Sequence, residues 1–120
     1  MIDKQLLLES CEAFGITLPE GAADKFDTYA QLLVEWNQKM NLTAITEPEE
    51  IVLKHFVDSL LLLKAVCLPQ NASLIDVGTG AGFPSMPVKI VREDMKVTML
   101  DSLQKRLTFL QEVNSSLNLD

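Results

Sequence analysis

Three helical patterns of apolar residues occupy the first half of the chain, and the second is the clearest. Its apolar side chains recur at three- and four-residue steps on one face, formed by Phe26, Ala30, Leu33, Trp36 and Met40. This spacing predicts an amphipathic helix from about Glu20 to Met40.

A third helix is predicted from about Glu47 to Val66. Thr46, followed by Glu49 three positions later, has the pattern of a capping box, and Pro48 suits a first helical turn. The stretch from Leu60 to Leu63 is apolar on nearly every side, so we expect it to be buried.

The pattern changes in the second half of the chain, where short apolar runs follow the linker Pro69-Gln70-Asn71. Strands are predicted at Ser73–Val77 and Lys96–Asp101, because each run is short, rich in apolar residues and bounded by turn or acidic residues. A short helix is predicted between them, from the region of Pro84 to Pro87 to about Arg92.

A last helix is predicted from about Ser102 onward, with one apolar stripe formed by Leu103, Leu107, Leu110, Val113 and Leu117. Strand, helix, strand and helix in this order predict a right-handed βαβ crossover. We therefore expect an α/β protein, with a helical region at 1–70 and the start of a parallel-sheet domain at 71–120.

Composition limits the classes of function. The 120 residues include 48% apolar types and a formal net charge of −7, which predicts one folded domain with a real core. An acidic balance argues against a nucleic-acid partner, because phosphates are neutralised by clustered Lys and Arg. The sequence shows neither a secretory signal nor an apolar run near the roughly 20 residues of a membrane span.

The two cysteines, Cys11 and Cys67, lie in apolar surroundings without a CxxC motif or a nearby histidine. We expect both to be reduced thiols in the core of a cytoplasmic protein, rather than metal ligands or redox groups.

The most informative segment is Asp76-Val77-Gly78-Thr79-Gly80-Ala81-Gly82-Phe83-Pro84, at the predicted junction of a strand and a helix. Ligands of doubly wound sheets bind at this edge, and glycine at 78, 80 and 82 lets the backbone approach a ligand closely. A dinucleotide fingerprint would have glycine at the position of Phe83, and Pro84 and Pro87 remove amide donors that a pyrophosphate needs. The pattern therefore favours a nucleoside without a phosphate chain.

Asp101 ends the next predicted strand, 19 residues beyond Gly82, at about the distance from which an acidic residue reaches a ribose diol. Asp76, beneath the glycine turn, is placed to hold loop amides or an ammonium group of the ligand. A nucleoside with an amino-acid tail and no phosphates describes S-adenosylmethionine. The alternative is a tight turn with a helix-capping aspartate.

Four motifs resemble the ribosomal RNA small-subunit methyltransferase G family, also called glucose-inhibited division protein B. In order they are Asn41-Leu42-Thr43-Ala44-Ile45, His55-Phe56-Val57-Asp58-Ser59-Leu60, the glycine segment from Asp76 to Pro84, and Leu100-Asp101-Ser102 with Lys105-Arg106 and Phe109-Leu110 after it. The resemblance covers essentially the whole chain.

This resemblance implies an S-adenosylmethionine-dependent enzyme that methylates N7 of a guanine in 16S ribosomal RNA. It also implies a helical cap on a Rossmann-like methyltransferase domain, of which this chain holds the first βαβα part. The family's cofactor contacts fall here on Gly78, Phe83 and Asp101. We expect Phe83 to line the methionine portion of the cofactor.

The sequence departs from the family at two points. Ser85 stands where the family has glycine, so we expect a slightly displaced loop or a lower cofactor affinity. The chain ends at Asp120, at roughly half the family's length, so we expect later strands and basic RNA-contacting residues to be missing. Among the residues present, Lys105 and Arg106 are the best candidates for RNA contacts, with a solvated helix face as the alternative.

Methylation at guanine N7 needs no general base, because N7 carries an in-plane lone pair and no proton. The protein's task is alignment of the reacting atoms, and the target base has to leave its stack. We therefore expect no catalytic residue. His55 and Asp58, one helical turn apart, are expected to bond each other or to brace a neighbouring loop.

Two other functions remain open. The chain is alternatively a non-catalytic fragment that associates with itself or with its missing half through an unpaired apolar strand edge. A nicotinamide-dependent oxidoreductase is a weaker alternative, because Phe83 and the two prolines disfavour a dinucleotide.

Overall fold

The computed structural model describes residues 1–119 and shows an α/β protein, as predicted. Its helical half contains α1 (Lys4–Ala13), α2 (Ala22–Asn37), α3 (Pro48–Glu50), the π-helix η1 (Ile51–Val57), α4 (Asp58–Leu60) and α5 (Leu62–Ala65). The second half contains β1 (Ser73–Val77), α6 (Ser85–Val91), β2 (Lys96–Leu100) and α7 (Gln104–Ser116). The α/β crossover predicted from the alternating patterns is confirmed.

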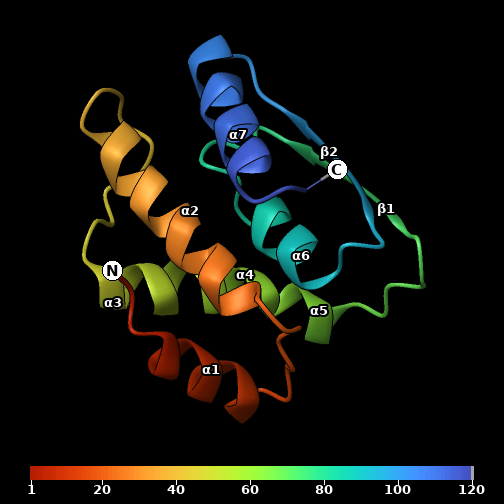
Figure 1. Ribbon diagram of the computed structural model, residues 1–120. Coiled ribbons are helices and arrows are strands. Elements are labelled where there is room, and N and C mark those ends of the chain that lie inside the picture. The colour runs from red at the N-terminus through yellow and green to blue at the C-terminus, as the bar shows by residue number, and fades with distance from the viewer. Residues whose placement is uncertain (120) are drawn as a thin grey trace.

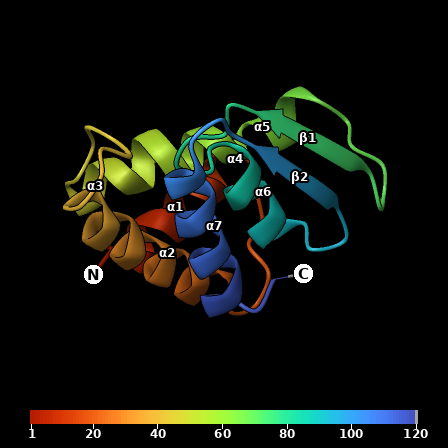
Figure 2. The same ribbon diagram turned by 90° about the horizontal axis from the view of Figure 1, so that it is seen from above.

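The two strands are parallel, with Val77 opposite Leu100 at the ends of β1 and β2. Figures 1 and 2 show the strands on one side of the molecule and α2 on the other, with α6 and α7 between them. One face of the sheet is therefore covered by helices. On the opposite face Ile75 and Val77 are 65% and 78% exposed.

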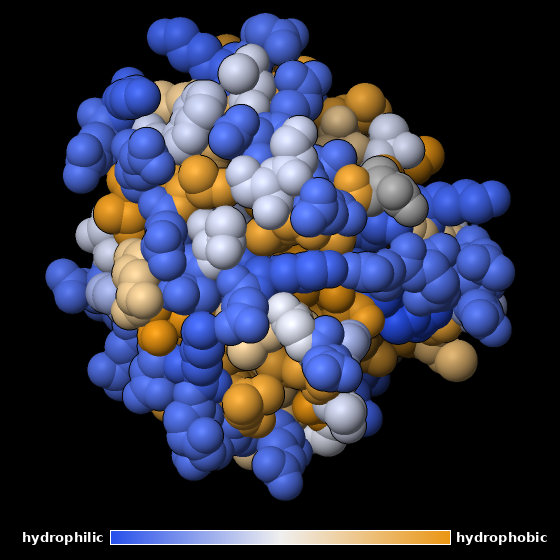
Figure 3. Space-filling model, in the orientation of Figure 1, coloured by the Kyte–Doolittle hydropathy of each residue, from blue (hydrophilic) through white to orange (hydrophobic). Residues whose placement is uncertain are grey.

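The core joins the helical half to the crossover. Its largest fully buried side chains include Phe26 and Tyr29 from α2, Phe56 from η1 and Phe109 from α7. Phe26 and Phe56 pack with ring centroids 4.7 Å apart. The predicted apolar face of α2 is thus the face that packs against both halves of the chain. Elsewhere apolar groups still reach the surface, as the orange patches between hydrophilic side chains in Figure 3 show.

The predicted third helix is continuous from Pro48 to Leu60 but widens into a π-helix at Ile51–Val57. The predicted capping box is wrong. Glu47 is the N-cap residue and none of the described side chains caps this end, since the helix begins one residue later than the pairing of Thr46 with Glu49 requires. Pro48 occupies the first turn, as predicted.

Three burial predictions also need correction. Cys11 is buried, but Cys67 is exposed, because α5 ends at Ala65 and Cys67 lies in the link to β1. In the apolar stretch Leu60–Leu63, Leu60 is fully buried and the three residues after it are partly exposed. Leu103 is 50% exposed, because it precedes the first turn of α7 instead of lying on its stripe.

None of the helices within residues 1–119 combines the length and apolar character that a membrane crossing requires.

Candidate functional site

The carboxyl ends of β1 and β2 meet at one edge of the sheet, because the strands are parallel and in register to their last residues. The amides of Gly78 and Thr79 both donate to the carbonyl oxygen of Leu100, at 2.7 and 3.1 Å. A cavity of about 360 Å³ opens at this edge, lined by Val77, Gly78, Leu100, Asp101, Ser102 and Leu107. This edge is the position at which such folds bind their ligands.

Gly78 and Gly80 leave one side of the loop open. Their φ angles are +71° and +60°, and an added Cβ would have no atom of residues 1–119 within 4 Å at either position. Both residues therefore combine a backbone conformation that favours glycine with free space next to the backbone. These properties fit the close approach of a ligand that the sequence predicts.

Gly82 is enclosed on the core side of the loop. Its φ is +98°, and an added Cβ would lie 2.8 Å from both Leu110 Cδ2 and Tyr29 Oη. Packing of the loop against α2 and α7 is thus sufficient to explain this glycine. A cofactor contact at Gly82 stays a prediction.

Asp101 connects the two strand ends. Its carboxylate accepts from the amides of Leu103 and Gly80, both at 2.9 Å, and from Arg106 Nη1 at 3.4 Å. These two amides, with Arg106, hold the pKa of Asp101 below its usual range. The side chain is only 2% exposed, and its bond to the Gly80 amide ties the loop to the end of β2. Its predicted bond to a ribose diol would use the acceptor sites that these donors leave.

Asp76 has a different partner from the one expected. Its carboxylate accepts from the hydroxyl of Thr79 at 2.9 Å, whereas the loop amide of Gly80 is held by Asp101. The hydroxyl of Ser85 lies 3.2 Å from that of Thr79 and serves as the donor, because the Thr79 proton already points to Asp76. Ser85 is fully buried. The serine that departs from the family pattern is therefore accommodated in a bonded chain beneath the loop.

Tyr29 is a site residue that the sequence reasoning missed. Its hydroxyl donates to the carbonyl of Ala81 from within the core, and burial, with the nearby Asp76 carboxylate, raises the pKa of the phenol well above its ordinary value. Tyr29 lies one turn from Phe26 and from Leu33, on the predicted apolar face of the helix. This position was the only feature of the sequence that could have indicated its role. Tyr29 fixes the loop from the side opposite Asp101.

Phe83 packs within the chain instead of standing free. The rings of His55 and Phe83 are parallel within 2°, with centroids 4.1 Å apart, and Tyr29 lies 5.5 Å from Phe83. Phe83 also lines a cavity of about 430 Å³ together with His55, Asp58 and neighbouring residues. Its predicted contact with the cofactor's methionine portion stays a prediction.

His55 has the partners of a bracing residue. Its Nε2 lies 2.8 Å from Thr43 Oγ1, in the loop before α3, and Thr43 Oγ1 also accepts from the amide of Ile45. Burial lowers the pKa of His55, with Asp58 acting weakly in the opposite direction. Of the two roles expected for His55, the structure shows contact with a neighbouring loop.

The start of α6 offers few free amides to a phosphate chain. Pro84 and Pro87 have no amide hydrogen, and the amide of Met86 donates to the carbonyl of Gly82 at 2.7 Å. A pyrophosphate at this helix would lack the usual set of donors. A nucleoside without phosphates at this site stays a prediction.

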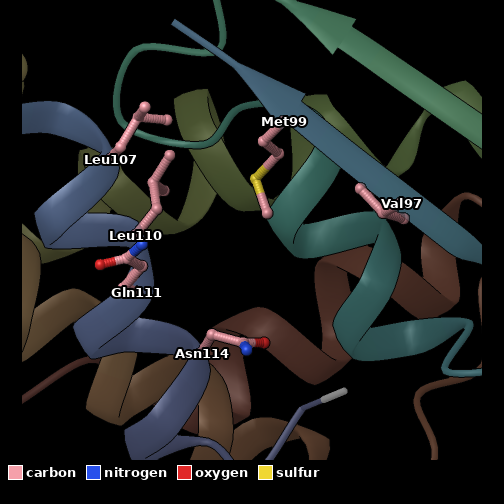
Figure 4. Close-up of a pocket in the computed structure, with 6 residues that line it drawn as sticks. All are labelled: Val97, Met99, Leu107, Leu110, Gln111 and Asn114. Atoms are coloured by element: carbon pink, nitrogen blue, oxygen red, sulfur yellow. The ribbon is translucent and has the colours of Figure 1, made fainter. Parts of the chain in front are cut away.

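The covered face of the sheet carries a separate groove of about 310 Å³ between β2 and α7. Figure 4 shows its lining, which is Val97 and Met99 from the strand and Leu107, Leu110, Gln111 and Asn114 from the helix. Leu107 lines both this groove and the cavity at the strand ends. The groove therefore adjoins the candidate site without containing its polar residues.

Lys105 and Arg106 occupy the first turn of α7 but differ in their contacts. Arg106 forms an ion pair with Asp101 and so belongs to the loop's support. Lys105 is exposed and lies with Trp36, Lys39, Met40 and Thr108 around another cavity.

Comparison with known proteins identifies the family of this chain. Residues 22–120 match the family described as rRNA small subunit methyltransferase G. The chain belongs to this family. Proteins named ribosomal RNA small subunit methyltransferase G from Acetivibrio thermocellus and Alkaliphilus metalliredigens are 53% and 46% identical to it, over 116 and 120 residues. These alignments cover 97% and 100% of this chain, but 48% and 50% of the relatives.

Another relative of the same name, from Clostridium perfringens, is 52% identical over 114 residues, covering 95% of this chain and 48% of the relative. The chain thus spans about half the length of the curated relatives it matches. The family membership predicted from the four motifs is confirmed.

Proposed function

We propose that this chain provides the methyl-donor site of an S-adenosylmethionine-dependent methyltransferase that acts on guanine N7 of 16S ribosomal RNA. The observation that carries the proposal is the pairing of the open glycine loop with Asp101 across the two strand ends, over a cavity of about 360 Å³. Family membership supports the reaction class.

In this proposal residues 1–70 form a helical cap, and residues 71–120 form the first part of a Rossmann-like cofactor domain. Asp120 lies outside the described residues. A ribosomal RNA substrate also implies a cytoplasmic protein.

The donor supplies an electrophilic methyl group, and the residues of this chain supply its position. Gly78 and Gly80 admit the ligand to the backbone, while Asp101 and Tyr29 hold the loop from opposite sides. Guanine N7 loses no proton, so no side chain is required as a base. Orientation of this kind contributes up to roughly 7 to 11 kcal/mol to catalysis.

Isothermal titration calorimetry with S-adenosylmethionine, its demethylated product and NAD tests the cofactor class. We expect the first two to bind and NAD to show no heat. The Asp101→Ala variant should bind the cofactor roughly tenfold or more weakly, since it loses charge-assisted hydrogen bonds. The matched control is Asp94→Ala, which removes another ion-paired carboxylate at the opposite end of β2.

Unchanged cofactor affinity in the Asp101→Ala variant would remove this residue from the site. Tight binding of NAD without binding of S-adenosylmethionine would reverse the proposal in favour of an oxidoreductase.

A second candidate function is self-association, because β1 has a strand neighbour on only one side within residues 1–119. Its side chains Ile75 and Val77 are the most exposed large apolar groups described. Unpaired apolar strand edges recruit further strands. Light scattering should therefore show a mass that rises with concentration, and a constant monomer mass would exclude this candidate.

A further inference from the structure

A small cavity lies where α2 ends and α7 begins. It has a volume of about 330 Å³ and is lined by Trp36, Lys39, Met40, Lys105 and Thr108. The ammonium group of Lys39 lies over the Trp36 ring, 5.7 Å from its centroid. Phe109 packs against Trp36 with centroids 5.8 Å apart, so the indole has support from the core.

The two lysines at this cavity form no ion pair within residues 1–119, whereas most basic residues of the chain are engaged by carboxylates or carbonyls. Of ten Lys and Arg residues, six are engaged by carboxylates or carbonyls, namely Lys4, Lys25, Lys54, Lys89, Arg92 and Arg106. Within residues 1–119, Lys39, Lys64, Lys96 and Lys105 form no ion pair. Two of these four meet at the only tryptophan of an acidic chain.

We propose that this Trp36–Lys39–Lys105 surface binds single-stranded RNA, with one base stacked on the indole and the flanking phosphates at the two lysines. The inference rests on the proposed function and assigns part of the RNA contact to residues outside the cofactor site. Trp36 is half-buried, so only part of its ring is open to a base; an accessible aromatic face flanked by cations is the usual construction of a single-strand site. A flat apolar partner alone would not use the two ammonium groups.

The position of the surface suits the proposed reaction. Figure 1 shows the end of α2 and the beginning of α7 at the same end of the molecule, and α7 starts directly after the loop that follows β2. Lys105 is adjacent in sequence to Arg106, which is paired with Asp101 at the cofactor edge. RNA held at Trp36 would therefore lie at the end of the molecule where the loop after β2 leads into α7.

Lys39 can serve both the free and the bound state. In the free chain its cation covers the indole, which is a favourable but weak contact at an exposed site. A base that stacks on the ring would displace the ammonium group toward a neighbouring phosphate. The long flexible side chain of lysine permits this movement.

The sole tryptophan makes the proposal directly measurable. Titration of the chain with a short single-stranded oligoribonucleotide should quench Trp36 fluorescence, because a stacked base contacts the indole. Lys39→Ala and Lys105→Ala should each weaken binding several-fold and lower the slope of log affinity against log salt by about 0.7. Lys96→Ala is the matched control, since Lys96 is also exposed and forms no ion pair within residues 1–119. It lies at the start of β2, whereas Lys105 follows the end of that strand.

Each outcome decides the proposal. RNA binding without quenching, equal quenching by the polyanion heparin, or equal weakening by Lys96→Ala would overturn it, as would a lack of RNA binding. Calorimetry with S-adenosylmethionine on the same variants keeps the two proposals separate. Cofactor binding that persists while the RNA result is negative overturns only the Trp36 surface, and loss of both overturns the proposed function as well.

Discussion

Replacement of Gly82 by alanine should destabilise the fold much more than the same change at Gly80. Both residues have a positive φ, which costs an L-residue roughly 1–2 kcal/mol. At Gly80 the new Cβ meets open space, so this conformational term is the whole cost. At Gly82 the Cβ would lie 2.8 Å from Leu110 Cδ2 and Tyr29 Oη, and 3.2 Å from Met86 Cβ.

These neighbours of Gly82 have little freedom to move. The Tyr29 hydroxyl is bonded to the carbonyl of Ala81, and the Met86 contact involves a Cβ fixed by α6. Inserting a methyl group into a packed core costs roughly 1–3 kcal/mol. The total for Gly82→Ala is then about 2–5 kcal/mol, against about 1–2 for Gly80→Ala.

Urea unfolding followed by Trp36 fluorescence measures this difference as a shift in midpoint at constant slope. Both variants reduce the conformational entropy of the unfolded chain equally, so this contribution cancels when their free energies of unfolding are compared. Equal free energies of unfolding for the two variants would show that the packing around Gly82 is not as tight as the structure has it.

Three further predictions concern buried polar groups and thiols. Tyr29→Phe should lower the free energy of unfolding by about 1–3 kcal/mol, because the carbonyl of Ala81 loses its buried donor, and an unchanged urea midpoint would contradict this. Burial lowers the pKa of His55 below 6.5, so near and below that pH the unfolded chain binds more protons than the folded chain, and the free energy of unfolding should fall as the pH drops from 6.5. Urea titrations at several pH values should show that His55→Gln abolishes this pH dependence. A dependence that survives the change would refute the prediction. Cys67 should react with a thiol reagent in the folded chain, whereas Cys11, whose pKa burial raises to about 11, should react only after unfolding; equal rates in buffer would contradict the structure.

The strands and the loop between them were predictable because their signals are local. Ser73–Val77 is a short apolar run that leads into glycines, and β1 has these bounds in the structure. The predicted capping box is wrong because it requires the helix to begin at one particular residue. A helix can begin one residue later and still present the same apolar face to the core. Cys67 was misplaced for a similar reason, since an apolar neighbourhood in sequence does not show where a helix ends.

The polar support of the loop could not be predicted from the sequence. Tyr29 lies 52 positions before its acceptor, the carbonyl of Ala81, and an apolar pattern shows that a residue is buried without showing where its hydroxyl points. Ser85 likewise reads as a departure from the family, although its hydroxyl completes a chain with Thr79 and Asp76. Hydrogen bonds between distant side chains depend on the assembled core.

The two sides of the glycine loop therefore have different physical tasks. On the inner side, Tyr29 and Gly82 fix the loop against the core, and changes there should act first on the free energy of unfolding. On the outer side, Gly78 and Gly80 face open space, so an added Cβ costs only the conformational term and changes there should act mainly on ligand affinity. Asp101 has both tasks: it braces the Gly80 amide and borders the cavity, so its replacement should affect stability and cofactor affinity together. A Gly78→Ala variant that keeps the stability of Gly80→Ala but loses cofactor binding would separate these tasks experimentally.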